Sequence, residues 1–140
     1  EATRMVRQLN FGMVDMAWHT ANPNNISSVA EFEKQAAAAT QIYPTIDETN
    51  FSTSFSHIFQ GGYSSGYYSY KWAEVLEADA FEYFKENGIF NKEIGAKFKD
   101  NILSKGGSEH PMTLYKRFRG QEPDNDALLK RAGLLEFSEK

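Results

Sequence analysis

The chain has 140 residues, with 15 Lys and Arg against 19 Asp and Glu, and it contains no cysteine. Such a length forms one domain, or one piece of a larger one, and we expect residues 1–140 to be a single helical domain. The slightly acidic balance disfavours general nucleic-acid binding, and the lack of cysteine excludes a disulfide framework and a thiolate zinc site. No apolar run approaches the ~20 residues that a membrane span needs. Because a cysteine-free chain suits a reducing compartment, we expect a cytoplasmic location, with the periplasm as the alternative.

The N-terminal half predicts two helices and then a loop. Apolar residues recur at spacings of three and four over residues 3–20, and a second apolar stripe predicts that this helix is buried on more than one side. Ser27 or Ser28 can cap the next helix, which ends near Thr40, and Glu31 three residues after Ser28 completes a capping-box pattern. The polar, β-branched residues 45–54 are typical of a loop. Since the chain opens directly on helical periodicity and without methionine, we expect it to be part of a longer polypeptide.

The C-terminal half predicts four more helices. The longest covers residues 67–87, with Tyr68 and Trp72 on its core stripe, and Gly88 suits the left-handed position that follows a helix. Asn91 is the expected cap of the next helix, whose apolar face carries Ile94, Phe98, Ile102 and Leu103. A glycine-rich turn over residues 104–108 precedes a helix that starts near Pro111. The last helix covers residues 124–132 and ends at Gly133, before a polar tail. Because no segment has a strand pattern, the predicted fold class is all-α.

Residues 55–72, FSHIFQGGYSSGYYSYKW, are unusually rich in tyrosine and glycine. Glycine weakens a strand interior, so we interpret this segment as a glycine-hinged loop that leads into a helix. It would bring His57 and several phenol hydroxyls to one place. A phenol stays protonated at neutral pH and donates a hydrogen bond to an oxyanion or a peptide carbonyl. From the pattern alone, these tyrosines are equally well explained as core aromatics whose hydroxyls reach water.

Other titratable residues predict less. His19, His57 and His110 show neither an HExxH pattern nor a pair at the i, i+4 spacing of a helical zinc site, so we expect no metal site within the chain. His19 and His110 have positions typical of helix capping or of the surface. Asp15 and Asp79 lie on otherwise apolar helices, and either they are buried carboxylates of interest or they face solvent or pair with an arginine.

The segment HIFQGGYSSGYYSYKWAEVLEADAF resembles the thimet oligopeptidase family of zinc metallopeptidases. Within that family it resembles the bacterial peptidyl-dipeptidase (dipeptidyl carboxypeptidase) branch first and oligopeptidase A next. RQLNFGMVDMAWH, STSFSHIF and ILSKGGSEHPMTLYKRFRGQEPDNDALLKRAGL look like the extreme C-terminal region of the same family. The resemblance therefore covers nearly the whole chain.

The resemblance implies roles for several residues of the segment 55–72. His57 is similar to the family histidine that hydrogen-bonds the substrate backbone beside the scissile bond. Tyr63 and Tyr70 are similar to the tyrosines that contact substrate, one of which helps to stabilise the tetrahedral oxyanion, so they are the expected catalytic residues. Tyr67 is similar to a further tyrosine of the cleft. The expected loop hinge comprises Gly61, Gly62 and Gly66.

The family's HExxH motif and its further glutamate ligand have no counterpart in this sequence. The resemblance thus implies the C-terminal part of the catalytic domain of a zinc peptidase, inactive alone, with zinc held by residues outside the chain. Its expected partners are short peptides, the rest of the same polypeptide and, for the isolated chain, other copies of itself. Weak candidates to bind a substrate's terminal carboxylate are Lys105, Arg117 and Arg119. The alternative function is a stand-alone all-α module that binds peptides without catalysis.

Overall fold

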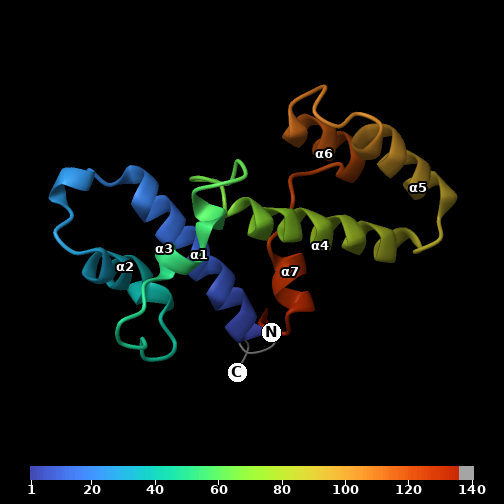
Figure 1. Ribbon diagram of the computed structural model, residues 1–140. Helices are drawn as coiled ribbons and strands as arrows, with labels where there is room; N and C mark the ends of the chain where they lie inside the picture. Colours follow the sequence, from blue (N-terminus) through green and yellow to red (C-terminus); the bar gives the residue numbers. More distant parts are fainter. Residues whose placement is uncertain (136–140) are drawn as a thin grey trace. The chain divides into compact units, whose positions relative to one another are not determined.

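The computed structural model describes residues 1–135, in two compact units that meet in sequence at Trp72 and Ala73. All seven α-helices of this described part are joined by loops and short helical turns, and no strand occurs in it, so the all-α prediction is confirmed (Figure 1). None of the described helices has the length and apolar character needed to cross a membrane. The predicted polar tail falls largely on residues 136–140, outside the described residues.

The first unit is built around α1 (Ala2–Thr20), which contacts α2 (Val29–Ala37) and the 3₁₀ turn η2 (Ala38–Thr40). Its core joins Val14 of α1 to Ala37, Ile58 and Tyr67, with Phe11 and Trp18 packed around them. The expectation that α1 is buried on more than one side is wrong for the described chain, because Leu9, Met13 and Met16 remain exposed on it. The predicted cap of α2 is confirmed, since the Ser28 hydroxyl accepts a hydrogen bond from the amide of Glu31.

The expected loop over residues 45–54 ends in a short helix, α3 (Phe51–Ser54). Its first amides, of Phe51 and Ser52, donate to the buried carboxylate of Glu33 at 2.8 and 3.0 Å. This carboxylate accepts from amides that have no partner within the helix, because they lie at its start. Its oxygens also lie at the positive, N-terminal end of the helix dipole, where negative charge is stabilising. Sequence reasoning missed α3 because the residue that caps it belongs to α2.

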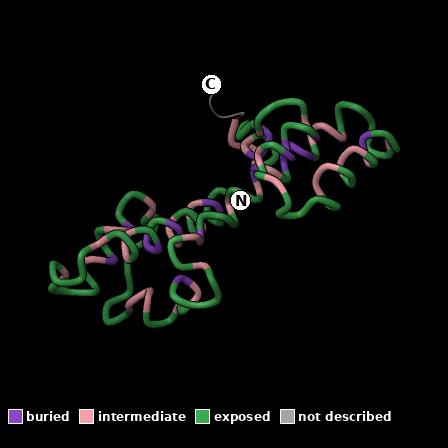
Figure 2. The backbone as a smooth tube through the Cα atoms, turned by 90° about the horizontal axis from the view of Figure 1, so that it is seen from above, coloured by how far each residue is buried: buried purple, intermediate pink, exposed green. Residues whose placement is uncertain are grey.

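The second unit contains most of α4 (Ser69–Asn87), then α5 (Lys92–Phe98), α6 (Pro111–Arg119) and α7 (Asp126–Arg131). Ala80, Ile94, Tyr115 and Phe118 form its core, and η4 (Lys99–Leu103), a π-helical turn, packs against α5 and α6. The predicted Asn91 cap and the positive φ of Gly88 are both confirmed. In both units the buried residues are few and come in short runs along the chain (Figure 2).

Four details of the predicted second half are wrong. The long helix begins at Ser69 rather than at residue 67, and Tyr68 and Trp72 are exposed rather than part of a core stripe. Leu103 is exposed as well, at the end of the π-helical turn. The last helix is shorter than residues 124–132, and the Asp124 carboxylate accepts from the amide of its first residue, Asp126.

Candidate functional site

The first unit brings His57, Tyr63, Tyr67 and Tyr70 into one aromatic cluster, which we call the tyrosine cluster. The His57 and Tyr63 rings meet edge to face with centroids 4.6 Å apart, and the Tyr63 and Tyr70 rings stack at 5.3 Å. The ring centroid of Tyr67 lies 5.1 Å from that of Tyr70 and 5.5 Å from that of His57. The Tyr70 hydroxyl lies 3.4 Å from Nε2 of His57. Residues separated by up to 13 positions in sequence therefore present an imidazole and phenol hydroxyls together.

The backbone between His57 and Tyr70 turns sharply, as its composition suggests. His57 lies in a 3₁₀ turn, η3 (Ser56–Ile58), which the fully buried Ile58 anchors in the core. Gly61 and Gly62 have φ of 73° and 79°, in the left-handed region that favours glycine. Gly66 does not have a positive φ. Its neighbour Ser65 does, with a φ of 53°. That any of these glycines acts as a hinge stays a prediction.

Burial separates the members of the tyrosine cluster into two kinds. Tyr67 is only 7% exposed, its hydroxyl donates to Oε1 of Gln8, and its burial raises the pKa of the phenol. Tyr70 is 39% exposed, whereas His57 and Tyr63 are half-buried. A hydrogen bond with Tyr63, helped by partial burial, raises the pKa of Tyr70 to about 12. Both phenols are therefore neutral hydrogen-bond donors at physiological pH, and Tyr70 is the more exposed of the two.

Asp15 of α1 also belongs to this region, and its contacts with the loop could not be predicted from sequence. The sequence offers it as a candidate buried carboxylate, and the structure shows it fully buried. Its two oxygens accept hydrogen bonds from the amides of Ser65 and Tyr67, and Nδ1 of His19 lies 2.9 Å from Oδ1. An Asp on an apolar helix face is a signal for a buried carboxylate, but its partners lie 50 and 52 residues away and no local pattern identifies them.

Asp79 of α4, the other candidate carboxylate, lies in the second unit and is buried too. It accepts a hydrogen bond from the Tyr115 hydroxyl and pairs with Arg119, as the arginine alternative predicted. Burial and this carboxylate raise the pKa of Tyr115. Arg119 also pairs with Glu86, and Arg117 binds both carboxylate oxygens of Glu109. Both arginines proposed for a substrate carboxylate therefore have acidic partners within the chain.

The described residues do not form a zinc site. Throughout residues 1–135, no three His, Cys, Asp or Glu side chains gather in a group that could hold a metal. The three histidines lie in separate environments: His19 contacts Asp15, His57 belongs to the tyrosine cluster, and His110 caps α6 by accepting from the amide of Met112.

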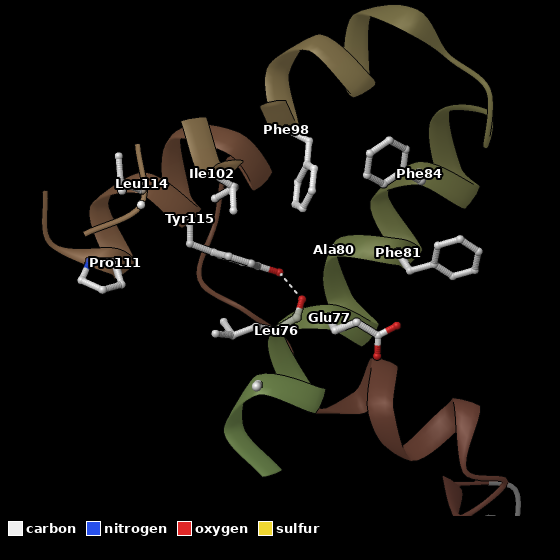
Figure 3. A pocket seen from close by; sticks show the side chains of 12 residues that line it. Leu76, Glu77, Ala80, Phe81, Phe84, Phe98, Ile102, Pro111, Leu114 and Tyr115 are labelled. Carbon is white, nitrogen blue, oxygen red and sulfur yellow. Dashed lines mark hydrogen bonds between the residues drawn. The ribbon is translucent and has the colours of Figure 1, made fainter. Parts of the chain in front are cut away.

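An apolar pocket of about 460 Å³ opens in the second unit, between α4, α6 and the turn after α5 (Figure 3). Phe81, Phe84, Phe98 and Leu114 line it, and the hydroxyl of Tyr115 donates to the carbonyl oxygen of Leu76 at its edge. Glu77 is the acidic residue among those that line it. An apolar lining of this kind offers surface for burial and few groups for acid–base work, so the tyrosine cluster remains the candidate site.

Residues 1–134 match the sequence model of Peptidase family M3. The chain is 49% identical over 131 residues to "Oligopeptidase A" of Escherichia coli (strain K12), an alignment that covers 93% of this chain and 19% of that protein. It is 41% identical over 132 residues to "Dipeptidyl carboxypeptidase" of Salmonella typhimurium, again over 93% and 19%. The expected order of the two branches is thus reversed. The chain spans about a fifth of the length of these curated relatives.

Proposed function

The chain belongs to Peptidase family M3, and from this premise we propose that it is the C-terminal part of a zinc peptidase that hydrolyses short peptides. In this proposal the tyrosine cluster binds the substrate backbone and stabilises the oxyanion, while the remainder of the polypeptide holds the zinc. The substrate class, the activity and the zinc all belong to the whole protein. The cytoplasmic location stays a prediction; an Arabidopsis thaliana relative is named "Probable cytosolic oligopeptidase A".

The observation that carries this proposal is the neutral hydroxyl of the exposed Tyr70, held beside His57 and Tyr63. When a peptide bond is attacked, its carbonyl oxygen gains negative charge, and donors already aimed at that oxygen stabilise the transition state more than the substrate. Tyr63 and Tyr70 are assigned this role. His57 is assigned a hydrogen bond to the substrate backbone next to the scissile bond.

The deciding experiment compares Tyr70→Phe and Tyr63→Phe with the parent in the intact protein. If a hydroxyl donates to the oxyanion, its loss lowers kcat by roughly 10²–10³ with a smaller effect on KM, as for other oxyanion donors. Tyr43→Phe is the matched control, since Tyr43 is an exposed tyrosine outside the cluster. An unchanged kcat in both test variants would return these tyrosines to a purely structural role.

A peptidase assay of the intact protein also separates internal cleavage from the release of C-terminal dipeptides. Because the oligopeptidase A relatives are more similar to this chain than the dipeptidyl carboxypeptidases, we propose internal cleavage. A substrate with an amidated C-terminus separates the two, because release of C-terminal dipeptides depends on a grip on the free carboxylate. Cleavage of the amidated peptide at the rate of the free acid would support internal cleavage, and its complete loss would support dipeptide release.

The peptide-binding module remains the second function, and the intact protein distinguishes the two. The proposal predicts that the purified 140-residue chain hydrolyses no peptide in a chelator-sensitive manner. If the intact protein bound short peptides and never cleaved them, with or without added zinc, the module would be the better description.

A further inference from the structure

Asp15 joins α1 to the backbone of the tyrosine cluster through both of its oxygens. Oδ1 accepts from the amide of Ser65 and Oδ2 from the amide of Tyr67, each at 2.9 Å. His19, one turn later on α1, places Nδ1 at 2.9 Å from Oδ1. Since the carboxylate is fully buried, water does not compete for these bonds. A buried, ionised acceptor of this kind makes stronger hydrogen bonds than a neutral one.

The two amides that Asp15 holds lie at the sharpest point of the segment. Ser65 has a φ of 53°, which a residue with a side chain adopts only when its surroundings impose it. The amide of Gly66, between them, donates to the carbonyl of Tyr63 at 2.8 Å. Asp15 therefore fixes a turn that has Tyr63 on one side and Tyr67 on the other, directly before α4 begins and Tyr70 follows.

We propose that Asp15 is a positioning residue of the peptidase site: its carboxylate, through the Ser65 and Tyr67 amides, holds the turn that aims Tyr63 and Tyr70. This inference rests on the proposed function of those tyrosines. Asp15 touches no substrate and acts through the backbone alone. Catalysis by positioned donors is sensitive to small displacements, because a shift of about 1 Å costs about 10²-fold in rate.

The second unit supplies a control of matching chemistry. Asp79 is as buried as Asp15, and it too accepts hydrogen bonds, from Tyr115 and Arg119. Its partners, Tyr115 and Arg119, are core side chains outside the tyrosine cluster. Replacing either aspartate by asparagine exchanges one of two buried acceptor oxygens for a donor, so both variants lose stability. Only the Asp15 variant is expected to disturb the tyrosine cluster.

The first measurement needs no variant. In hydrogen exchange of the intact protein, the amides of Ser65 and Tyr67 should exchange as slowly as those of the helix cores, although they lie in a loop. The amides of Gly61 and Gly62, in the exposed part of the same loop, provide the fast reference. If Ser65 and Tyr67 exchanged as fast as these glycines, Asp15 would not hold the turn and the proposal would be overturned.

The second measurement compares Asp15→Asn and Asp79→Asn in the intact protein, at a temperature where both are folded. We expect Asp15→Asn to lower kcat roughly tenfold to a hundredfold and to speed exchange at Ser65 and Tyr67. Asp79→Asn should lower the melting temperature but leave kcat within about twofold of the parent, because it touches no member of the cluster. Equal losses of kcat in both variants would indicate a general loss of structure and sink the proposal.

A double variant separates this inference from the proposed function. If Asp15 acts through the tyrosines, adding Asp15→Asn to Tyr70→Phe should lower kcat far less than it does alone. Fully additive losses would show that Asp15 acts elsewhere. If Tyr63→Phe and Tyr70→Phe both left kcat unchanged, the proposed function would fail, and the exchange of Ser65 and Tyr67 would still decide whether Asp15 holds the turn.

Discussion

At the scale of single residues, the proposed chemistry depends on the protonation of Tyr70. The hydrogen bond with Tyr63 is the largest cause that raises the pKa of Tyr70 to about 12. A phenol with an ordinary pKa near 10 loses its proton, and with it its capacity to donate, two pH units earlier. The pair therefore extends the pH range in which Tyr70 is a donor.

We expect Tyr63→Phe to lower the pKa of Tyr70 from about 12 toward its ordinary value, since the variant removes the hydrogen bond that raises it. Tyrosinate absorbance during an alkaline titration, with Tyr70→Phe to identify the signal, measures this change. Because the pKa is higher in the folded than in the unfolded chain, the linked stability is complete below pH 10 and is lost as the pH rises through about 12. An unchanged Tyr70 titration in Tyr63→Phe would contradict the pairing.

At the scale of elements, side-chain caps determine where several helices begin. The caps of α2 and α5 are local: Ser28 and Asn91 accept from amides two or three residues later, so the sequence reveals them. The caps of α3 and of the turn before α4 are distant, because Glu33 and Asp15 reach them across the fold. Local caps are predictable from spacing, whereas distant caps depend on tertiary packing.

Asn91 offers a clear test of a local cap. Its side-chain oxygen accepts from the amides of Glu93 and Ile94, at 2.9 and 3.4 Å, at the start of α5. Asn91→Ala leaves both amides without this partner and should lower the free energy of unfolding by about 1 kcal/mol. Asn91→Asp keeps an acceptor at the same place and is the matched control. Chemical denaturation measures both, and equal stability of Asn91→Ala and the parent would show that the cap contributes nothing.

At the scale of the whole molecule, the two units leave much apolar surface exposed. On α1, Leu9, Met13 and Met16 are 39–44% exposed and lie together with Tyr68 around an apolar hollow. The second unit has the apolar pocket beside α4. Contiguous apolar surface of this kind marks an interaction site or causes association. This fits the proposal that the rest of a longer polypeptide packs against the chain.

The isolated chain should accordingly self-associate as its concentration rises. Replacing Leu9 and Met13 by lysine removes apolar surface and adds charge on α1, so the double variant should shift sedimentation velocity profiles toward the monomer. Phe90→Lys is the control, since Phe90 is 96% exposed and lies outside the residues that line both apolar hollows. A chain that stayed monomeric over a wide concentration range would contradict the expectation.

The all-α class, the starts of several helices and the clustering of His57 with tyrosines could be predicted from sequence alone. These features follow from short-range physics: apolar spacing of three and four, caps such as Asn91, and the positive φ of Gly88. His57, Tyr63, Tyr67 and Tyr70 lie within 14 consecutive positions, so their gathering could be expected from the segment itself. Tyr68 and Trp72 were misplaced because helical periodicity indicates which residues share a face but not whether that face is covered.

The partners of the buried carboxylates, by contrast, depend on how distant segments pack. Asp15 and Asp79 look alike in sequence, as carboxylates on apolar helices, yet Asp15 holds loop amides 50 residues away and Asp79 holds Tyr115 and Arg119. The fold likewise distinguished the buried Tyr67 from the solvent-facing Tyr70, and gave the positive φ to Ser65 rather than Gly66. A buried charge requires a partner, but packing between distant segments selects which one, and no local pattern records that choice.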